Sequence, residues 1–466
     1  MLSREGTAEN EKKRRHALRP FVLSAAIVCL CFLLTSTAWL TWEYHLMDQA
    51  FSRFSDLMTM GIGYAMQAAG LGAFAALLRR KGAFAEKTVP FALILHALVL
   101  IPALLSSTVT GTLISGFFLN PLCGYIAGYY LHMLAQTVEA GRRASALGIG
   151  YSASILLSWL LSSVGGGAVY YSKNVWLICL ALTALTLALM RYQPIRPPRK
   201  APAPLPEEEA SSRRTLLLCV AGVVLLFSMV INSGFSFSSA DLVQGVRVEF
   251  SRLFYAMGLL IAGFVTDRDR KWGAAAALSA LVIPFMMLAL RGEPVSLTVF
   301  WALNYFAYGF YSVFRLIVFS DAADKYGLVW LSGFGLLVGR LGDAIGEGVN
   351  LALAHSSTAL VFLAALFFVA AVFLFFRVYR PLYAPAAARQ QSERERFYCF
   401  STKHDLSARE RDMLRLLLEG KTNGEIAAAL SISENTVKFH IRNLLQKTGC
   451  RNRSGLIALY MDDYPS

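Results

Sequence analysis

Long apolar runs without a charged residue constrain this chain more than any other feature of its sequence. Three of them occupy residues 21–40, 215–230 and 359–376. A helix needs roughly 20 predominantly apolar residues to cross the hydrocarbon core of a bilayer. Only 16% of the residues are charged, whereas a typical soluble domain has about a quarter. We therefore expect most of the chain to be a helical membrane protein.

The apolar stretches, taken in order, predict a polytopic bundle of about twelve membrane-spanning helices. The first stretch follows a basic segment, as in a secretory signal. It is longer than the apolar core of a signal and lacks a clear small-residue cleavage site, so we expect an uncleaved first span. The predicted spans are centred on Val28, Gln67, Ile94, Ala127, Leu156, Leu180, Leu225, Leu259, Val282, Tyr308, Val338 and Leu366.

The loops between the predicted spans alternate in charge. Only scattered cations, such as Arg53 and Lys173, fall on one side of the bundle. Because cytoplasmic loops carry the excess of Lys and Arg, we expect a multi-pass protein of the cell membrane with both termini in the cytoplasm. The basic segments on the predicted cytoplasmic side are the N-terminal arm and residues 79–81, 142–143, 191–214, 268–271 and 377–380.

A proline-rich segment divides the predicted spans into two halves. Residues 191–214 contain six prolines followed by three glutamates, and such a composition predicts an extended polar linker. We expect a cytoplasmic arm at residues 1–19, a first half of about six helices at residues 20–190, and a second half of about six at residues 215–379.

Two six-helix halves joined by a cytoplasmic loop resemble the major facilitator superfamily of transporters. Residues 263–271, Gly-Phe-Val-Thr-Asp-Arg-Asp-Arg-Lys, are similar to that family's loop motif between the second and third helices of a half, without the usual glycine before the basic pair. Residues 72–81 of the first half end in basic residues but contain no aspartate. The resemblance implies an all-α, major-facilitator-like fold, while the degenerate motif weakens the case for transport.

The sequence changes character beyond the last predicted span. Residues 380–404 are rich in proline and alanine and then in charge, which predicts a tether to a small C-terminal domain at residues 405–466. In this domain Ser407 and Thr422 each precede a glutamate by three residues, the pattern of a capping box. Ser433 is the predicted N-cap of a further helix, which we expect to run to Thr448. Two short helices with a tight turn between them are typical of a helix-turn-helix, here within a domain of about four helices.

The helix that follows Ser433 has two different faces. Val437, Ile441 and Leu444 recur at helical spacing and are expected to face the domain core. On the opposite stripe, Lys and Arg can donate to guanine, Asn can pair with adenine, and Phe can contact a thymine methyl group. For Lys447 a phosphate contact and an ordinary solvated side chain are both open. The residues expected to contact DNA are Asn435, Thr436, Lys438, Phe439, Arg442 and Lys447.

The domain resembles the LuxR-type helix-turn-helix. The matching motifs are Leu406-Ser-x-Arg-Glu, Gly420-x-x-Asn-x-Glu-Ile-Ala, and Leu430-x-Ile-Ser-x-x-Thr-Val-Lys-x-His-x-x-Asn. The resemblance implies binding to double-stranded DNA as a dimer, with Lys438, Phe439 and Arg442 at the reading positions of the recognition helix.

Charged residues inside an apolar, glycine-rich span mark a second candidate site. Arg340, Asp343 and Glu347 are spaced to lie on one helical face, and ionisable groups at membrane depth usually face a bundle interior. They predict either a ligand or proton site or an internal ion pair that locks helices. Asn304 and Tyr308 belong to a span that lines the central cavity in the resembled fold, so they join the candidate site, with ordinary core or lipid-facing packing as the alternative.

These features predict a one-component transcriptional regulator whose transporter-like bundle senses a small molecule. The rival hypothesis is an active secondary transporter that carries an accessory DNA-binding domain. We expect no enzymatic activity, because the sequence contains no nucleophile–base–acid set and no phosphate-binding loop. The seven cysteines form no CxxC pair, so no metal or other cofactor is expected either.

Overall fold

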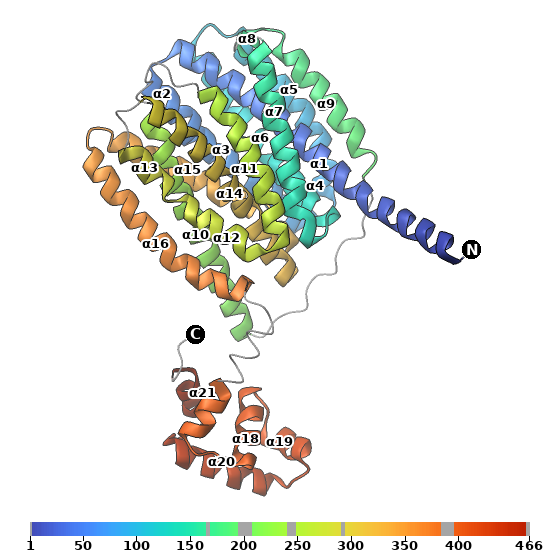
Figure 1. Ribbon diagram of the computed structural model, residues 1–466, viewed down its shortest axis with the longest axis vertical. Helices are drawn as coiled ribbons and strands as arrows, with labels where there is room; N and C mark the ends of the chain where they lie inside the picture. The colour runs from blue at the N-terminus through green and yellow to red at the C-terminus, as the bar shows by residue number, and fades with distance from the viewer. Residues whose placement is uncertain are drawn as a thin grey trace. The chain divides into compact units, whose positions relative to one another are not determined.

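The structure is a computed structural model that describes residues 2–164, 168–193, 207–239, 248–289, 294–383 and 396–462. Within these ranges the chain is helical and contains no β-strand, in agreement with the predicted all-α class. The chain divides into two compact units, Met1–Tyr383 and Ala384–Ser466 (Figure 1). The boundary lies within the predicted tether.

The larger unit is a bundle of long helices interrupted by short ones. Up to the predicted linker the elements are α1 (Leu2–Gln49), α2 (Ser52–Asp56), η1 (Leu57–Gly63), α3 (Tyr64–Lys81), α4 (Phe84–Lys87), α5 (Val89–Leu105), α6 (Val109–Thr137), η2 (Ala140–Arg142), α7 (Arg143–Val164), α8 (Ala168–Tyr171) and α9 (Val175–Met190). After it come α10 (Glu207–Ser239), α11 (Val248–Arg268), α12 (Arg270–Ala280), α13 (Ile283–Ala289), α14 (Pro294–Tyr326), η3 (Val329–Leu331), α15 (Phe334–Ala352) and α16 (Ser357–Tyr383).

Eight helices in the described residues are long and apolar enough to cross a membrane. The twelve-span count is therefore not confirmed. The predicted span around Val282 is broken, because α12 ends at Ala280 and α13 begins at Ile283. The helix around Val338 contains three ionisable residues, which lower its hydropathy, and α9 has only 16 residues. The arrangement of six plus six helices remains a prediction.

Glycines allow α3 and α6 to cross in backbone contact. A Cβ atom added at Gly70 would lie 1.9 Å from the carbonyl oxygen of Pro121, and one added at Gly124 would lie 1.9 Å from that of Gln67. Real Cβ atoms do not approach so closely, so only glycine fits at either position. Small residues at helix crossings are typical of packing in membrane bundles.

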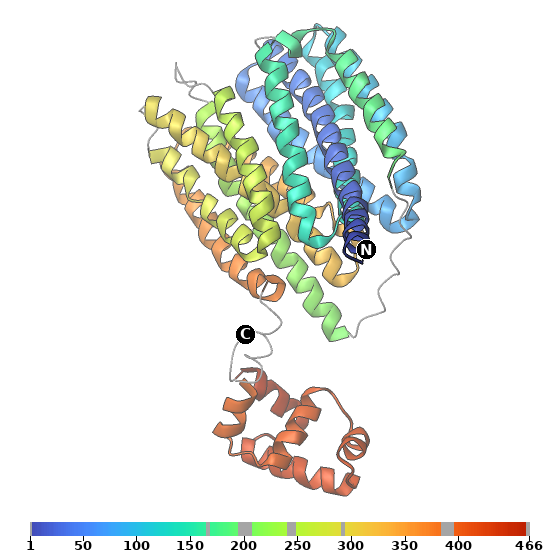
Figure 2. The same ribbon diagram turned by 45° about the vertical axis from the view of Figure 1, so that its right-hand side comes forward.

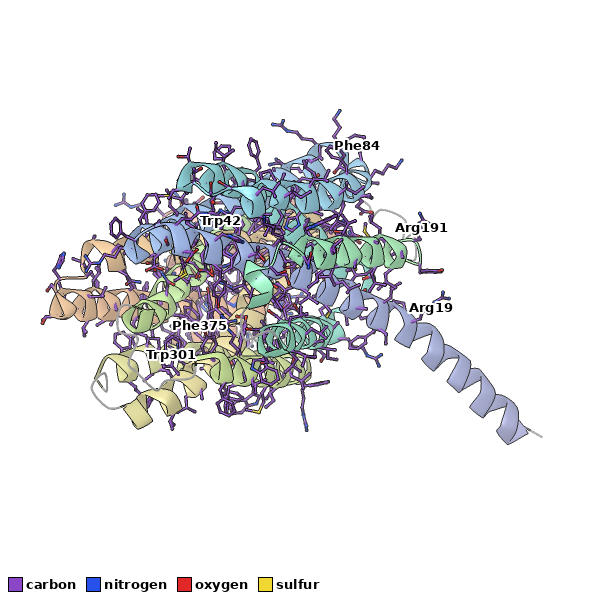
Figure 3. The ribbon with its side chains drawn as sticks, turned by 90° about the horizontal axis from the view of Figure 1, so that it is seen from above. Arg19, Trp42, Phe84, Arg191, Trp301 and Phe375 are labelled. Carbon is purple, nitrogen blue, oxygen red and sulfur yellow. The ribbon has the colours of Figure 1, made fainter. Side chains whose placement is uncertain are left out.

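Contacts between α7 and α11 join the segments on either side of the linker. α7 packs against α1 on one side and against α11 on the other (Figures 1 and 2). Large side chains fill the interior: Trp42 is 2% exposed and donates its indole N–H to the carbonyl oxygen of Thr112 at 2.8 Å. Phe84, by contrast, lies at the periphery (Figure 3).

The described part of the smaller unit begins with a helical segment at residues 396–403. It is followed by α18 (Ala408–Leu418), α19 (Asn423–Leu430), α20 (Glu434–Thr448) and α21 (Arg453–Asp462). They enclose a core of their own, separate from those of the bundle. The fully buried side chains in it are Phe400, Met413, Leu414, Leu417, Ile426, Val437, Leu444 and Leu456.

Candidate nucleic-acid interface and buried charge cluster

The capping residues set the helix starts of the small domain as predicted. Ser407 accepts a hydrogen bond from the backbone N–H of Glu410, and Thr422 accepts one from that of Glu425. In both capping boxes the glutamate carboxylate accepts a hydrogen bond from the backbone N–H of the N-cap residue. Ser433 caps α20 by accepting from the N–H of Thr436 at 3.2 Å. These bonds satisfy donors that a helix N-terminus would otherwise leave unpaired.

A tight turn places α20 against α19. Ser431 adopts a left-handed conformation with φ of 53°, and the N–H of Ile432 donates to the carbonyl oxygen of Ala427 at 3.0 Å. The turn directs Val437 and Leu444 into the core, where both are fully buried, while Ile441 is half-buried at its edge. The apolar stripe predicted for this helix is confirmed, and the arrangement is a helix-turn-helix.

The opposite face of α20 is exposed and rich in hydrogen-bond donors. Asn435, Lys438 and Arg442 are exposed, and Phe439 is 60% exposed. Within residues 396–462 neither Lys438 nor Arg442 has an ion-pair partner. Both also line a shallow groove of about 480 Å³ beside the helix. Unpaired cations and a bare aromatic ring on one helical face suit contact with the edges of bases in a DNA groove.

Two predicted contact residues make bonds inside the domain. Thr436 is half-buried at the start of α20, where its N–H joins the Ser433 cap. The ammonium of Lys447 donates to the Glu410 carboxylate at 2.8 Å and to the carbonyl oxygen of Asp405 at 2.7 Å. Lys447 thus ties the end of α20 to the first turn of α18, and contact between this residue and DNA remains a prediction.

Comparison with known proteins places this domain in a family. Residues 404–460 match the family described as bacterial regulatory proteins, luxR family. The chain is 49% identical over 55 residues to the spore germination protein GerE of Bacillus subtilis (strain 168), an alignment that covers 12% of this chain and 74% of GerE. The chain belongs to the luxR family of bacterial regulatory proteins.

Other luxR-family relatives match over the same short segment. The chain is 50% identical over 56 residues to the probable transcriptional regulatory protein SgaR of Hyphomicrobium methylovorum. It is 48% identical over 56 residues to the nitrate/nitrite response regulator protein NarP of Escherichia coli (strain K12). In each case the alignment covers 12% of this chain and 26% of the relative, so the chain spans about a quarter of the length of these two. The C-terminal domain is thus a DNA-binding, transcription-regulating module of the luxR type.

The predicted charged face of α15 faces the interior of the bundle. Asp343 and Glu347 are buried, and Arg340 is partly buried. The Asp343 carboxylate lies 3.1 Å from the guanidinium of Arg315 on α14 and 3.7 Å from that of Arg340. Glu347 and the backbone of Asp343 accept hydrogen bonds from the amide of Asn232 on α10. The structure therefore brings Arg340 and Asp343 together with a further ionisable residue, Arg315, and Asn232 links Asp343 to Glu347.

Arg315 was missed by the sequence analysis. It is only 4% exposed, and its guanidinium lies 5.0 Å from the centre of the Tyr311 ring and 5.7 Å from that of Tyr308. Its position as a lone cation in a long apolar stretch was a usable signal, because a buried charge needs a partner. Asn304, one turn before Tyr308, is buried, and its amide nitrogen has no hydrogen-bond partner among the described residues.

The loop motif at residues 263–271 forms a second polar junction. Asp267 accepts hydrogen bonds from the backbone N–H groups of Ala144 and Ser145, at 3.1 Å and 2.6 Å, at the start of α7. Arg270 pairs with Asp267 at 2.8 Å and with Asp321 on α14 at 3.0 Å. A carboxylate at a helix N-terminus is stabilised by the free N–H groups and the helix dipole. The motif therefore joins α7 to α11, α12 and α14.

Proposed function

We propose that this protein is a membrane-embedded one-component transcriptional regulator. In this proposal the helical bundle senses a small molecule and thereby controls sequence-specific DNA binding by the C-terminal domain. The observation that carries the proposal is the exposed, donor-rich face of α20, which lies in the same chain as eight described helices able to cross a membrane. A luxR-type domain on such a chain can receive its signal from the bundle.

Exposed side chains of α16 support placement in a lipid bilayer. Phe362, Leu366, Val369, Phe373 and Phe376 recur along one helical face and are 57% to 76% exposed. A continuous apolar stripe of this kind is costly in water and is stable against lipid. Because DNA lies in the cytoplasm, the C-terminal domain must lie there too, in agreement with the basic loops.

Reporter fusions test the proposed topology. Fusions after Lys200 and after Asp405 should give cytoplasmic signals, and a fusion after Ser172 should give an external one. A cytoplasmic signal at Ser172 would rule out the proposed orientation of the first half.

The cluster around Asp343 is the proposed sensing site. The Asp343 carboxylate lies between the guanidinium groups of Arg315 and Arg340, and Arg315 also lies against the Tyr308 ring. The Nε–H of Arg315 and the amide of Asn304 have no hydrogen-bond acceptor among the described residues. Buried donors without acceptors are costly, so a ligand that supplies acceptor oxygens would gain free energy here. The neighbouring tyrosines favour a ligand with an aromatic or amphipathic body.

A ligand changes DNA binding only if it binds one arrangement of the bundle more tightly than another. The Asp267 junction is a suitable element for such a change, because its bonds to Ala144 and Ser145 connect helices on the two sides of the linker. Breaking these bonds would remove one of the links between α7 and α11. We propose that the ligand-bound and ligand-free bundles differ at this junction. We further propose that the tethered domains of two chains bind DNA as a dimer in only one of the two states.

The proposed function is tested in cells by mapping where the tagged full-length protein occupies the genome and by profiling expression in a deletion strain. Occupied sites should lie upstream of genes whose expression changes. Asp343→Asn and Glu347→Gln should alter induction of these genes while leaving DNA binding by the isolated C-terminal domain unchanged. An unaltered response in both variants would assign this helical face a purely structural role.

An active secondary transporter with an accessory DNA-binding domain is the alternative. The buried ion pair between Arg315 and Asp343 favours it, because ionisable residues inside membrane bundles often mark substrate or proton paths. Proteoliposomes containing the purified protein decide between the two. Sustained uptake of a labelled inducer would favour the transporter, and binding without uptake would favour the sensor.

A further inference from the structure

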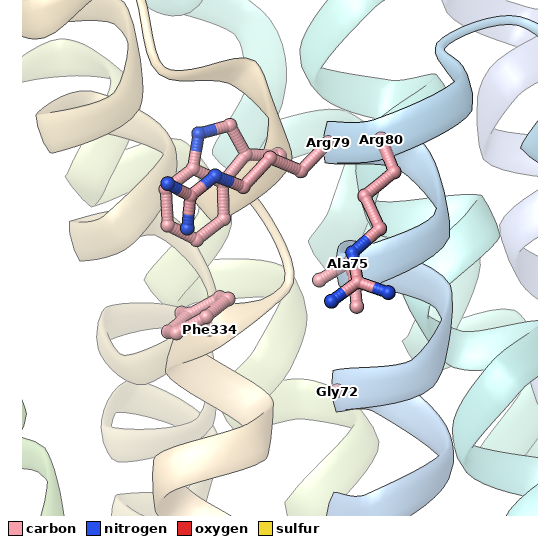
Figure 4. A pocket seen from close by; sticks show the side chains of 7 residues that line it. Gly72, Ala75, Arg79, Arg80 and Phe334 are labelled. Atoms are coloured by element: carbon pink, nitrogen blue, oxygen red, sulfur yellow. The ribbon is translucent and has the colours of Figure 1, made fainter.

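A pocket at the end of α3 is not used by the proposed sensing site. It has a volume of about 550 Å³, within the range of small-molecule sites. One wall is the C-terminal part of α3, and the other is formed by Trp330 of η3 and Phe334 of α15. Figure 4 shows Arg79 and Arg80 extending from α3, with Phe334 on the opposite wall. The walls come from segments on opposite sides of the linker.

The pocket carries positive charge without an internal counter-ion. Arg79 and Arg80 are exposed, and neither has an ion-pair partner in the part of the chain that the structure describes. The Arg79 guanidinium lies over the Trp330 ring, 5.0 Å from its centre, which fixes its position. Arginine presents a planar fork of N–H donors that matches the oxygens of phosphate or carboxylate. The pocket is therefore built for an oxyanion.

The position of the pocket along α3 identifies the source of that oxyanion. The apolar stretch Arg53–Lys81 ends at these basic residues, so they mark the proposed boundary between hydrocarbon and water. Tryptophan, such as Trp330 in the pocket wall, is enriched at this membrane–water interface. Basic pockets between transmembrane helices on the cytoplasmic side commonly bind anionic headgroups.

We propose that this pocket binds the phosphate of an anionic phospholipid headgroup. Arg79 and Arg80 hold the phosphate oxygens, and Phe334 contacts the glycerol side of the headgroup. Because the walls belong to α3 and to the η3–α15 segment, an occupied pocket favours the bundle state in which these segments lie together. The lipid composition of the membrane then biases the conformational equilibrium of the bundle. This inference rests on the proposed membrane location but not on the proposed sensing site.

The test uses the full-length protein in nanodiscs of phosphatidylcholine with increasing fractions of phosphatidylglycerol. Lipid affinity is read from the rise in melting temperature and from lipid retained in native mass spectrometry. Four proteins are compared: the wild type, R79Q/R80Q, the charge-matched control R191Q/R377Q, and Ala76→Phe. Arg191 and Arg377 are exposed cations outside the pocket, whereas Ala76 lines it and its replacement fills it without changing charge.

We expect phosphatidylglycerol to stabilise the wild type and the R191Q/R377Q control equally. R79Q/R80Q removes both groups that hold the phosphate, and at roughly tenfold in affinity for each charge-assisted contact it should bind the lipid about a hundredfold more weakly. Ala76→Phe should lose the effect with its charge intact. Equal loss in R79Q/R80Q and R191Q/R377Q would show diffuse attraction and overturn the site, as would full retention in Ala76→Phe.

Two further experiments distinguish lipid from soluble phosphate as the ligand and test the assumption that the bundle lies in a membrane. Soluble glycerol phosphate added to pure phosphatidylcholine nanodiscs should not stabilise the wild type. If it does, and R79Q/R80Q abolishes the effect, the pocket is a phosphate site supplied from solution and the lipid proposal is overturned. A protein that fails to enter nanodiscs at all would contradict the membrane location, whereas one that enters without lipid preference would contradict the pocket alone.

Discussion

The ammonium of Lys447 lies 2.8 Å from the carboxylate of Glu410, and this contact joins the last turn of α20 to the first turn of α18. Glu410 is buried and also accepts the backbone N–H of Ser407 at 2.7 Å. Burial acts to raise the pKa of Glu410, but the hydrogen bonds from Lys447 and Ser407 outweigh it and hold the pKa below its ordinary value. One side chain therefore serves as both capping residue and ion-pair partner.

The lowered pKa of Glu410 predicts how the stability of the C-terminal domain depends on pH. A group whose pKa is lower in the folded than in the unfolded state stabilises the fold above its unfolded pKa, about 4.3 for glutamate. That contribution is lost as the pH falls through the folded pKa. The melting temperature of the domain should therefore fall below about pH 4.3, and Glu410→Gln should flatten this fall.

Glu410→Gln should also cost roughly 1 kcal/mol of stability near neutral pH, since Lys447 is partly exposed and water screens the pair. The melting temperature of the domain, measured by circular dichroism across pH, checks both effects. Asp412→Asn is the matched control, because its pairing with Arg409 is exposed and long, at 3.9 Å. Identical pH profiles for wild type and Glu410→Gln would disprove the role given to this carboxylate.

The features predicted well were those set by near neighbours in the chain. The caps at Ser407, Thr422 and Ser433 each depend on a residue three positions away, so they could be read directly from the sequence. The two faces of α20 follow from the helical period alone. The luxR motif adds fixed spacings within one small domain, and these were sufficient to identify its family.

Contacts between distant segments could not be predicted in the same way. Arg315 and Asp343 meet only because α14 and α15 pack side by side. The sequence around either residue therefore does not predict the other as its partner. The motif around Asp267 was visible, but its bond to the start of α7 joins positions more than a hundred residues apart. Hydropathy also does not show where a helix breaks, as it does between α12 and α13, and the count of twelve spans stays a prediction.

The Arg315–Asp343 pair predicts a specific pattern of stability. Asp343→Asn leaves two guanidinium groups in the interior without their shared carboxylate, and breaking such a buried pair costs roughly 3–5 kcal/mol. Removing both partners in R315Q/D343N should restore part of the loss, because Arg315 then leaves no unpaired guanidinium, and only Arg340 loses its contact with the carboxylate. Melting temperatures of the purified full-length variants in detergent measure this. Arg315→Gln is measured as well, and a double variant whose loss equals the sum of the two single losses would show that the two residues act independently.

The crossing of α3 and α6 predicts a strict requirement for glycine. Gly124→Ala places a Cβ against the backbone of Gln67, so the helices must separate, at a cost of roughly 1–3 kcal/mol. Gly348→Ala on α15 is the control, because nothing lies within 4 Å of the added Cβ. Yield and melting temperature of the full-length protein should fall for Gly124→Ala only. Equal behaviour of the two variants would mean that the crossing relaxes without cost.

The exposed face of α20 predicts which residues read DNA. Arg442→Ala and Lys438→Ala should each weaken specific binding by roughly 1–3 kcal/mol if they contact base edges. Both side chains are exposed and outside the core, so the domain should keep its melting temperature. Arg411→Ala on α18 removes the same charge from an exposed position away from α20 and is the matched control.

The measurement is a binding titration of residues 394–466 on an operator taken from the occupancy map and on scrambled DNA. A fused dimer is titrated alongside the single domain, because paired half-sites supply much of the affinity in helix-turn-helix proteins. Arg442→Ala and Lys438→Ala should reduce the ratio between operator and scrambled affinities, whereas a residue that contacts only phosphate lowers both affinities and reduces the salt dependence. If both variants discriminate as well as the wild type and Arg411→Ala, then α20 is not the helix that reads the sequence.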